Sequence, residues 1–175
     1  MTVPEFSRGF ALNTIGTTPR TVAISAEAKE REALAARFDL IAIDRLEAQA
    51  TLAVEGDAIL CRGTLTANVV QECVATAAPV AAARKADFTI RFVAHLADGA
   101  LADEIEIDVD DCDIVEHDGQ AVDLGEAVAQ TLMLALDPFP RAANAAKALK
   151  EAGIVGEDEL GNAAFAGLKG LLSKP

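Results

Sequence analysis

The chain has 175 residues, which is long enough for one substantial hydrophobic core. Hydrophobic residues make up 51% of it, Trp and Tyr are absent, and the formal net charge is -13. A negative field of this size repels phosphate backbones, which argues against broad, non-specific binding to bare nucleic acid. No uninterrupted apolar stretch approaches the roughly 20 residues of a membrane-spanning helix. Because Glu5 and Arg8 stand where a signal peptide would be apolar, we expect a cytoplasmic protein.

The N-terminal part predicts two extended segments and a helix. The extended segments lie within residues 6–24 and are separated by a Gly-Thr-Thr-Pro breaker at residues 16–19. A helix is predicted over residues 26–38, with Ser25 at the N-cap and Glu27 in the first turn.

The middle of the chain alternates apolar and polar residues with a period of two, which predicts strands with one buried face. Two such runs, residues 45–54 and 59–72, form a predicted hairpin around the Glu-Gly-Asp turn at residues 55–57. A third strand is predicted at residues 88–93 and a fourth at residues 104–110. We expect Phe88 and Phe92 to face the core.

The C-terminal third predicts helices. Asp123, followed three residues later by Glu126, resembles a capping box that opens a helix ending before Pro138. Further helical stretches are predicted near residues 142–151 and 162–172.

These elements predict an α+β fold: a twisted antiparallel sheet of four to six strands, able to curl toward a barrel, with two flanking helices. We expect a single domain over residues 1–141 and an Ala/Lys/Gly-rich helical tail over residues 142–175.

The three cysteines predict no metal site. Cys61 and Cys73 share one face of a predicted strand, about 40 Å apart if the strand is straight, so they cannot hold one ion together. We interpret them as buried apolar thiols and expect no cofactor. His95 and His117 are expected at the surface. A hydrolase that uses Cys73 or Cys112 with a histidine stays open as an alternative.

Three surfaces are candidates for partner binding. The first is the proline-rich exit from the predicted helix, and the second is an acidic strand that lacks the spacing of a calcium loop and would suit a Lys- and Arg-rich protein. The third is the amphipathic tail, which is too short to be stable alone. The candidate residues are Pro138, Phe139, Pro140, Arg141, Glu104, Glu106, Asp108, Phe165 and Leu168.

Three stretches of this sequence resemble the YceD family of large ribosomal RNA subunit accumulation proteins. Residues 63–76 read GTLTANVVQECVAT and resemble the family's strand with its cysteine-bearing turn. Residues 122–141 read VDLGEAVAQTLMLALDPFPR and resemble the family's closing helix and proline-rich exit. Residues 162–169 read NAAFAGLK and are a weaker match to the family's ending.

The resemblance implies a non-catalytic accessory factor in accumulation of large-subunit ribosomal RNA and in ribosome biogenesis, acting by binding. The charge favours a ribosomal protein or assembly factor as direct partner, with ribosomal RNA contacted indirectly. No small-molecule substrate is identified from the sequence. Many family members carry Cys-x-x-Cys at the turn; here Thr76 takes the second place, so no metal is expected. An acidic protein-interaction module unrelated to ribosomes is the alternative.

Overall fold

The computed structural model describes residues 4–95 and 113–154, and contacts divide the chain into two compact units. The first unit contains residues 1–71 and 81–138, and the second contains residues 72–80 and 139–175. The predicted boundary between a domain and a tail after residue 141 stays a prediction.

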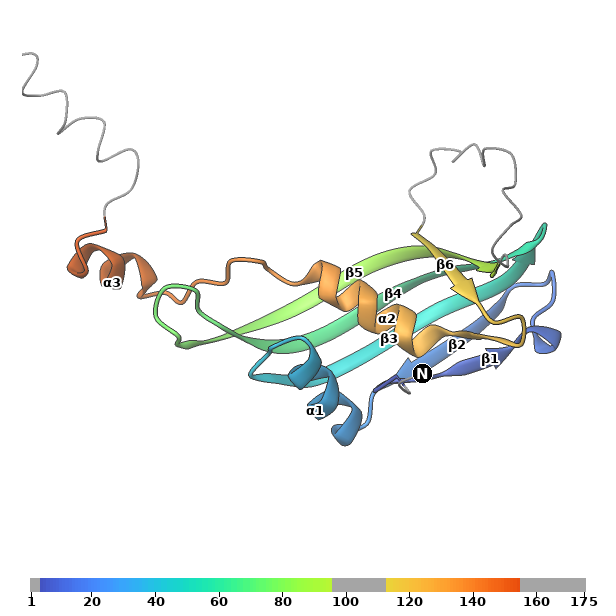
Figure 1. Cartoon of the computed structure of the whole chain (residues 1–175), viewed down its shortest axis with the longest axis horizontal. Helices are drawn as coiled ribbons and strands as arrows, with labels where there is room; N and C mark the ends of the chain where they lie inside the picture. Colours follow the sequence, from blue (N-terminus) through green and yellow to red (C-terminus); the bar gives the residue numbers. More distant parts are fainter. Residues whose placement is uncertain (1–3, 96–112, 155–175) are drawn as a thin grey trace, which may run out of the picture. The chain divides into compact units, whose positions relative to one another are not determined.

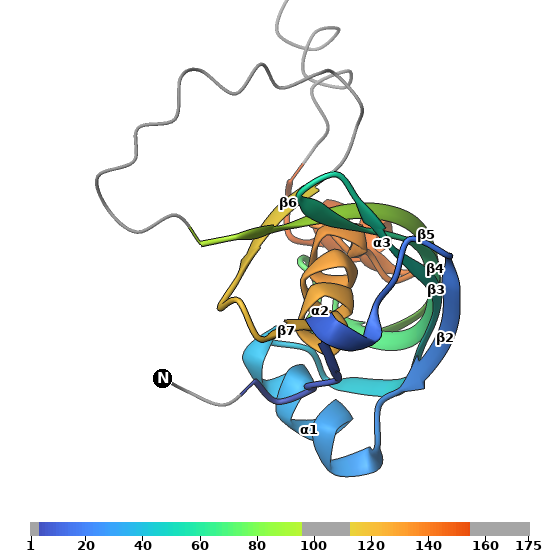
Figure 2. The ribbon, with the colours of Figure 1, turned by 90° about the vertical axis from the view of Figure 1, so that its right-hand side faces the viewer.

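A twisted sheet and one helix across its face organise the first unit (Figure 1). Within the described residues the sheet has five strands in the order β2-β3-β4-β5-β6. Their bounds are Arg20–Ser25 (β2), Ala42–Glu55 (β3), Ala58–Glu72 (β4), Pro79–Ala94 (β5) and Asp113–His117 (β6). The sheet curves around helix α2 (Leu124–Ala135) but stays open, because β2 and β6 are edge strands (Figure 2).

Three short elements complete the first unit. Strand β1 (Gly9–Ala11) pairs antiparallel with β7 (Ala121–Asp123), and a 3-10 turn, η1 (Leu12–Thr14), follows β1. Helix α1 (Ala28–Arg37) packs on β3.

The core of the first unit lies between the concave face of the sheet and α2. The strands supply alternate residues, as the period of two predicts, and α2 supplies the side of its first three turns that faces them. Phe88 and Phe92 are 7% and 1% exposed, so their predicted burial is confirmed. The largest fully buried contributors are Phe6, Leu34, Leu46, Leu52, Leu65, Val69, Ile90, Phe92, Val122, Leu124, Val128 and Leu132.

The α+β fold class is confirmed, with one difference in the sheet. Strand pairs β2–β3 and β3–β4 are antiparallel, but β5 and β6 are parallel, so the sheet is mixed. Parallel neighbours need a long crossover, and this connection contains residues 96–112, outside the described part of the chain. The predicted strand at residues 104–110 lies there as well.

The predicted N-cap of α1 is wrong. Ser25 is the last residue of β2, where it pairs with Glu47, and Glu27 is the N-cap. The Glu30 carboxylate accepts a hydrogen bond of 2.7 Å from the Glu27 backbone N–H, which satisfies a donor at the helix start.

The second unit is described over residues 72–80 and 139–154. It contains the turn between β4 and β5 and helix α3 (Ala145–Glu151), which confirms a helix near the predicted residues 142–151. The predicted helix at residues 162–172 lies outside the described residues. None of the described helices is long and apolar enough to cross a membrane.

Candidate functional site

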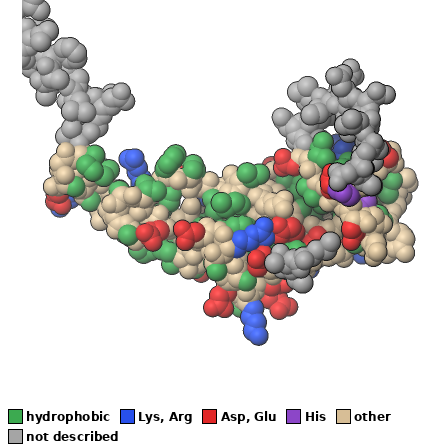
Figure 3. Space-filling model, in the orientation of Figure 1, with side chains coloured by type: hydrophobic (Ala, Val, Ile, Leu, Met, Phe, Trp, Pro, Cys, Tyr) green, Lys and Arg blue, Asp and Glu red, His purple; other side chains and the backbone are tan. Residues whose placement is uncertain are grey.

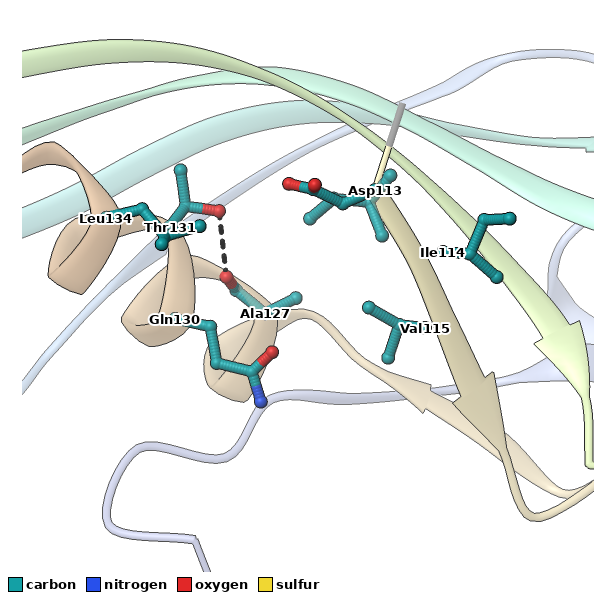
Figure 4. Close-up of a pocket in the computed structure, with 8 residues that line it drawn as sticks. Asp113, Ile114, Val115, Ala127, Gln130, Thr131 and Leu134 are labelled. Atoms are coloured by element: carbon teal, nitrogen blue, oxygen red, sulfur yellow. Dashed lines mark hydrogen bonds between the residues drawn. The ribbon is translucent and has the colours of Figure 1, made fainter. Parts of the chain in front are cut away.

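A hollow lies between α2 and β6 in the first unit (Figure 4). One side is a stripe of α2, residues Ala127, Gln130, Thr131 and Leu134, which recur every three or four positions and so share a helix face. The Thr131 hydroxyl donates to the Ala127 carbonyl at 3.0 Å. The hollow has a volume of about 230 Å³.

The opposite side of this hollow comes from the sheet. Val115 lines it from β6 and Ile90 from β5. The Asp113 carboxylate points toward α2 across the opening, whereas the Ile114 side chain points away from α2 (Figure 4). The parallel β5–β6 pairing sets this arrangement, because Asp113 and Val115 pair with the core residues Ile90 and Phe92.

A second hollow, of about 330 Å³, adjoins the first and shares Val115, Ala127 and Gln130 with it. We call the two hollows together the α2–β6 groove. The second hollow carries the carboxylates of Glu116, Asp118, Asp123 and Glu126. Among the described residues, no Lys or Arg lines either hollow.

Most carboxylates of the second hollow already serve the fold. Asp123 accepts from the Glu126 N–H at 3.2 Å and so caps α2, and Glu126 pairs with Arg37 at 2.8 Å. The Arg37 guanidinium holds the pKa of Glu126 below its usual range. The backbone N–H groups of residues 120 and 121 likewise lower the pKa of Asp118.

Two carboxylates of the groove lack such a role. Glu116 contacts His95 at 2.5 Å, and that ring is charged only when it is protonated. The Asp113 carboxylate has no hydrogen-bond or ion-pair partner among the described residues. The groove therefore holds a net negative charge that the described part of the chain does not neutralise.

Exposed apolar side chains accompany these acids. Leu134 is 78% exposed and Met133 is 49% exposed on α2. Ile114 is 52% exposed on β6, on the side that points away from α2. Figure 3 shows hydrophobic and acidic side chains next to one another on the face where α2 and β6 lie. Such a surface has the chemistry of a protein-binding groove.

The predicted contact residues of the proline-rich exit do not form one uniform patch. Pro138 is exposed and follows Asp137, whose carbonyl accepts a 2.8 Å hydrogen bond from the Gln71 amide. In the second unit, Phe139 is 70% exposed and Arg141 is exposed, whereas Pro140 is buried. The remaining predicted contacts, Glu104, Glu106, Asp108, Phe165 and Leu168, lie outside the described residues.

Cysteine chemistry differs between the two units. In the first unit, burial raises the pKa of the Cys61 thiol to about 12, so it carries no thiolate at neutral pH. In the second unit, Cys73 is 2% exposed, and its sulfur accepts the Ala142 N–H at 3.2 Å. That bond and the Thr76 side chain lower the pKa of Cys73 to about 7. Cys112 lies outside the described residues.

Metal-ligating residues do not gather in the described part of the chain, where no group of three His, Cys, Asp or Glu side chains could hold an ion. His95 is exposed, as predicted, and His117 is half-buried, with its Nδ1 accepting from the Gly119 N–H at 3.0 Å.

The groove was missed from the sequence, although one feature pointed to it. Residues 131–136 read TLMLAL, so the helix is apolar on more faces than the sheet can cover. Leu134 was therefore recognisable as an apolar residue without a core partner. The position of Asp113 was not recognisable, because it depends on the parallel pairing of β6.

Comparison with known proteins gives one match. The family model described as large ribosomal RNA subunit accumulation protein YceD matches residues 61–172, which is more than half of the chain. This match confirms the resemblance found in the sequence, and its range includes the whole α2–β6 groove. No curated protein and no solved structure matches the chain.

Proposed function

The chain belongs to the YceD family of large ribosomal RNA subunit accumulation proteins, and from this premise we propose that it promotes accumulation of large-subunit ribosomal RNA. It does so in the cytoplasm as a non-catalytic factor of ribosome biogenesis that acts by binding. The observation that carries this proposal is the family match over residues 61–172.

The chemistry of the α2–β6 groove supports binding rather than catalysis. Its carboxylates at Asp118, Asp123 and Glu126 are engaged in a turn, a helix cap and an ion pair. The contacts of Asp118 and Glu126 lower the pKa of each of these two groups. A general acid needs a raised pKa near the working pH, which is the opposite of the shifts at Asp118 and Glu126.

The charge of the chain supports a basic protein as the direct partner. At a net charge of -13, contacts with bare ribosomal RNA would have to overcome repulsion, whereas a basic ribosomal protein or assembly factor would be attracted. Ribosomal RNA is then affected through that partner.

Depletion of the protein from cells tests this function. We expect the ratio of large- to small-subunit ribosomal RNA to fall and free large subunits to decrease in gradient profiles. Re-expression of the wild-type chain should restore both. An unchanged ratio, under conditions where depletion impairs growth, would contradict the proposal and favour an acidic interaction module that serves basic proteins outside the ribosome.

A further inference from the structure

Within the α2–β6 groove, we propose a docking site for a basic, apolar segment of a protein partner. The segment places an apolar side chain beside Leu134 and a Lys or Arg side chain against Asp113. The identity of the partner as a protein of the large ribosomal subunit rests on the proposed function, whereas the site itself rests on the structure.

Helix α2 supplies apolar surface to the docking site. Leu134 is 78% exposed, yet it belongs to the same helix stripe as Ala127 and Thr131, which line the hollow. Ile90 and Val115 supply further apolar surface on the opposite side. An apolar side chain of a partner that lies across this opening would remove Leu134 from water together with its own surface.

Strand β6 and the residues from its end to the first turn of α2 supply the charged groups of the docking site. Five carboxylates line the groove, no Lys or Arg does, and Asp113 has no ionic or hydrogen-bond partner within the described residues. A lysine or arginine of the partner can pair with Asp113 and with Glu116, both of which are exposed to solvent. A phosphate would meet only repulsion there, so the charge favours a basic peptide over a nucleic acid.

The size of the groove also favours a peptide. Its hollows of about 230 and 330 Å³ lie at or below the low end of small-molecule sites, which range over roughly 300–1,000 Å³. Each hollow has room for a side chain rather than for a buried ligand, as expected where a chain segment inserts a few anchors.

Peptide binding tests the site. Fluorescently labelled overlapping peptides that cover the large-subunit ribosomal proteins are titrated with the full chain, and binding is followed by anisotropy. We expect a small set of Lys- or Arg-rich peptides with apolar residues to bind, and acidic peptides not to bind. Leu134→Lys should weaken their binding about tenfold or more, and Asp113→Asn about threefold.

Two matched substitutions serve as controls. Ile41→Lys places the same charge on an apolar residue that is 52% exposed outside the groove, and Asp57→Asn removes an exposed carboxylate from the β3–β4 turn. Both should bind like the wild type. Leu134→Gln, which adds no charge, should also weaken binding, and thermal melts should show that all variants fold.

The results distinguish failure of the docking site from failure of the ribosomal role. Binding that survives Leu134→Lys and Asp113→Asn, or binding of acidic peptides, overturns the site while leaving the ribosomal role intact. Absence of any binding peptide, or self-association of the chain that Leu134→Lys abolishes, also overturns it. If basic peptides from proteins outside the ribosome bind equally well through Leu134, the site stands, and the depletion experiment alone decides the ribosomal role.

Discussion

At the scale of single residues, the two described thiols show how local contacts decide ionisation. Cys61 lies in the core of the first unit, where burial disfavours the thiolate and raises its pKa to about 12. Cys73 is equally inaccessible, but backbone and side-chain donors surround its sulfur and lower its pKa to about 7. Burial alone, which is all that the sequence pattern predicts, does not distinguish the two.

We predict that the Cys73 thiol ionises near neutral pH. The ultraviolet absorbance of the thiolate, taken as wild type minus Cys73→Ser, should rise with a midpoint near pH 7 because the Ala142 N–H stabilises the anion. A midpoint near that of an ordinary free thiol, about 8.5, would contradict this assignment.

The same shift predicts the pH dependence of stability. The folded pKa of Cys73 lies below its unfolded value, so between the two values the unfolded chain binds more protons and stability rises with pH. The contribution is complete above the unfolded pKa and is lost as pH falls through about 7. Denaturant unfolding followed at several pH values should show this rise in the wild type and not in Cys73→Ser.

At the scale of elements, the N-terminus of α2 holds the N-terminal segment of the chain in place within the first unit. The Asp123 carboxylate accepts from the Glu126 N–H, from the Arg8 N–H at 2.8 Å and from the Ser7 hydroxyl at 2.6 Å. Gly125 allows the same approach, since an added Cβ would lie 2.5 Å from the Phe6 carbonyl oxygen. Asp123 and Gly125 therefore have structural roles, although they lie in residues 122–141, a stretch that carries the family resemblance.

We predict that Asp123→Ala lowers the free energy of unfolding by about 1–3 kcal/mol, because it removes the helix cap and leaves the Arg8 N–H without its acceptor. Urea unfolding monitored by circular dichroism measures the change. Asp123→Asn retains an acceptor oxygen and is the control, which should lose less. A loss below roughly 0.5 kcal/mol for Asp123→Ala would show that Asp123 does not anchor the N-terminal segment.

Local patterns predicted most elements but not their neighbours in space. The strands over residues 45–54 and 59–72 and the helix after Asp123 follow from alternation and capping, which are properties of adjacent residues. The short strand β6 was missed because it pairs in parallel with β5. Such a pair is joined by a long crossover and leaves no hairpin signal in the sequence. The groove depends on that pairing, so the sequence indicated Leu134 at most.

Ser25 shows how a local helix-capping signal gave a wrong N-cap prediction. A serine before a helical pattern usually caps it, but here strand β2 continues through Ser25 and pairs it with Glu47. The helix then begins at Ala28, with Glu27 as its N-cap. Strand pairing overrode the local preference.

At the scale of the whole molecule, charge and groove act on different steps of binding. The net charge of -13 acts at long range and attracts a basic partner before contact, which raises the association rate. Leu134 acts only once the partner is in place, so it governs how long the complex lasts. Substitutions of residues that do not line the groove can therefore separate the two effects.

The last prediction concerns this separation. Glu55→Lys combined with Asp57→Lys changes the net charge from -13 to -9 at the exposed β3–β4 turn, because each substitution adds two units. At low salt, association with a groove-binding peptide should slow about two- to fivefold, while dissociation stays unchanged. The difference should vanish at about 1 M salt, where the screening length is roughly 3 Å.

Leu134→Gln should give the opposite kinetic result: an unchanged association rate and faster dissociation at every salt concentration. Stopped-flow fluorescence measures both rates for each variant. If the turn substitutions accelerate dissociation as strongly as Leu134→Gln does, the turn itself contacts the peptide. The partner would then extend beyond the α2–β6 groove onto the β3–β4 turn, and the division between long-range attraction and local docking would be wrong.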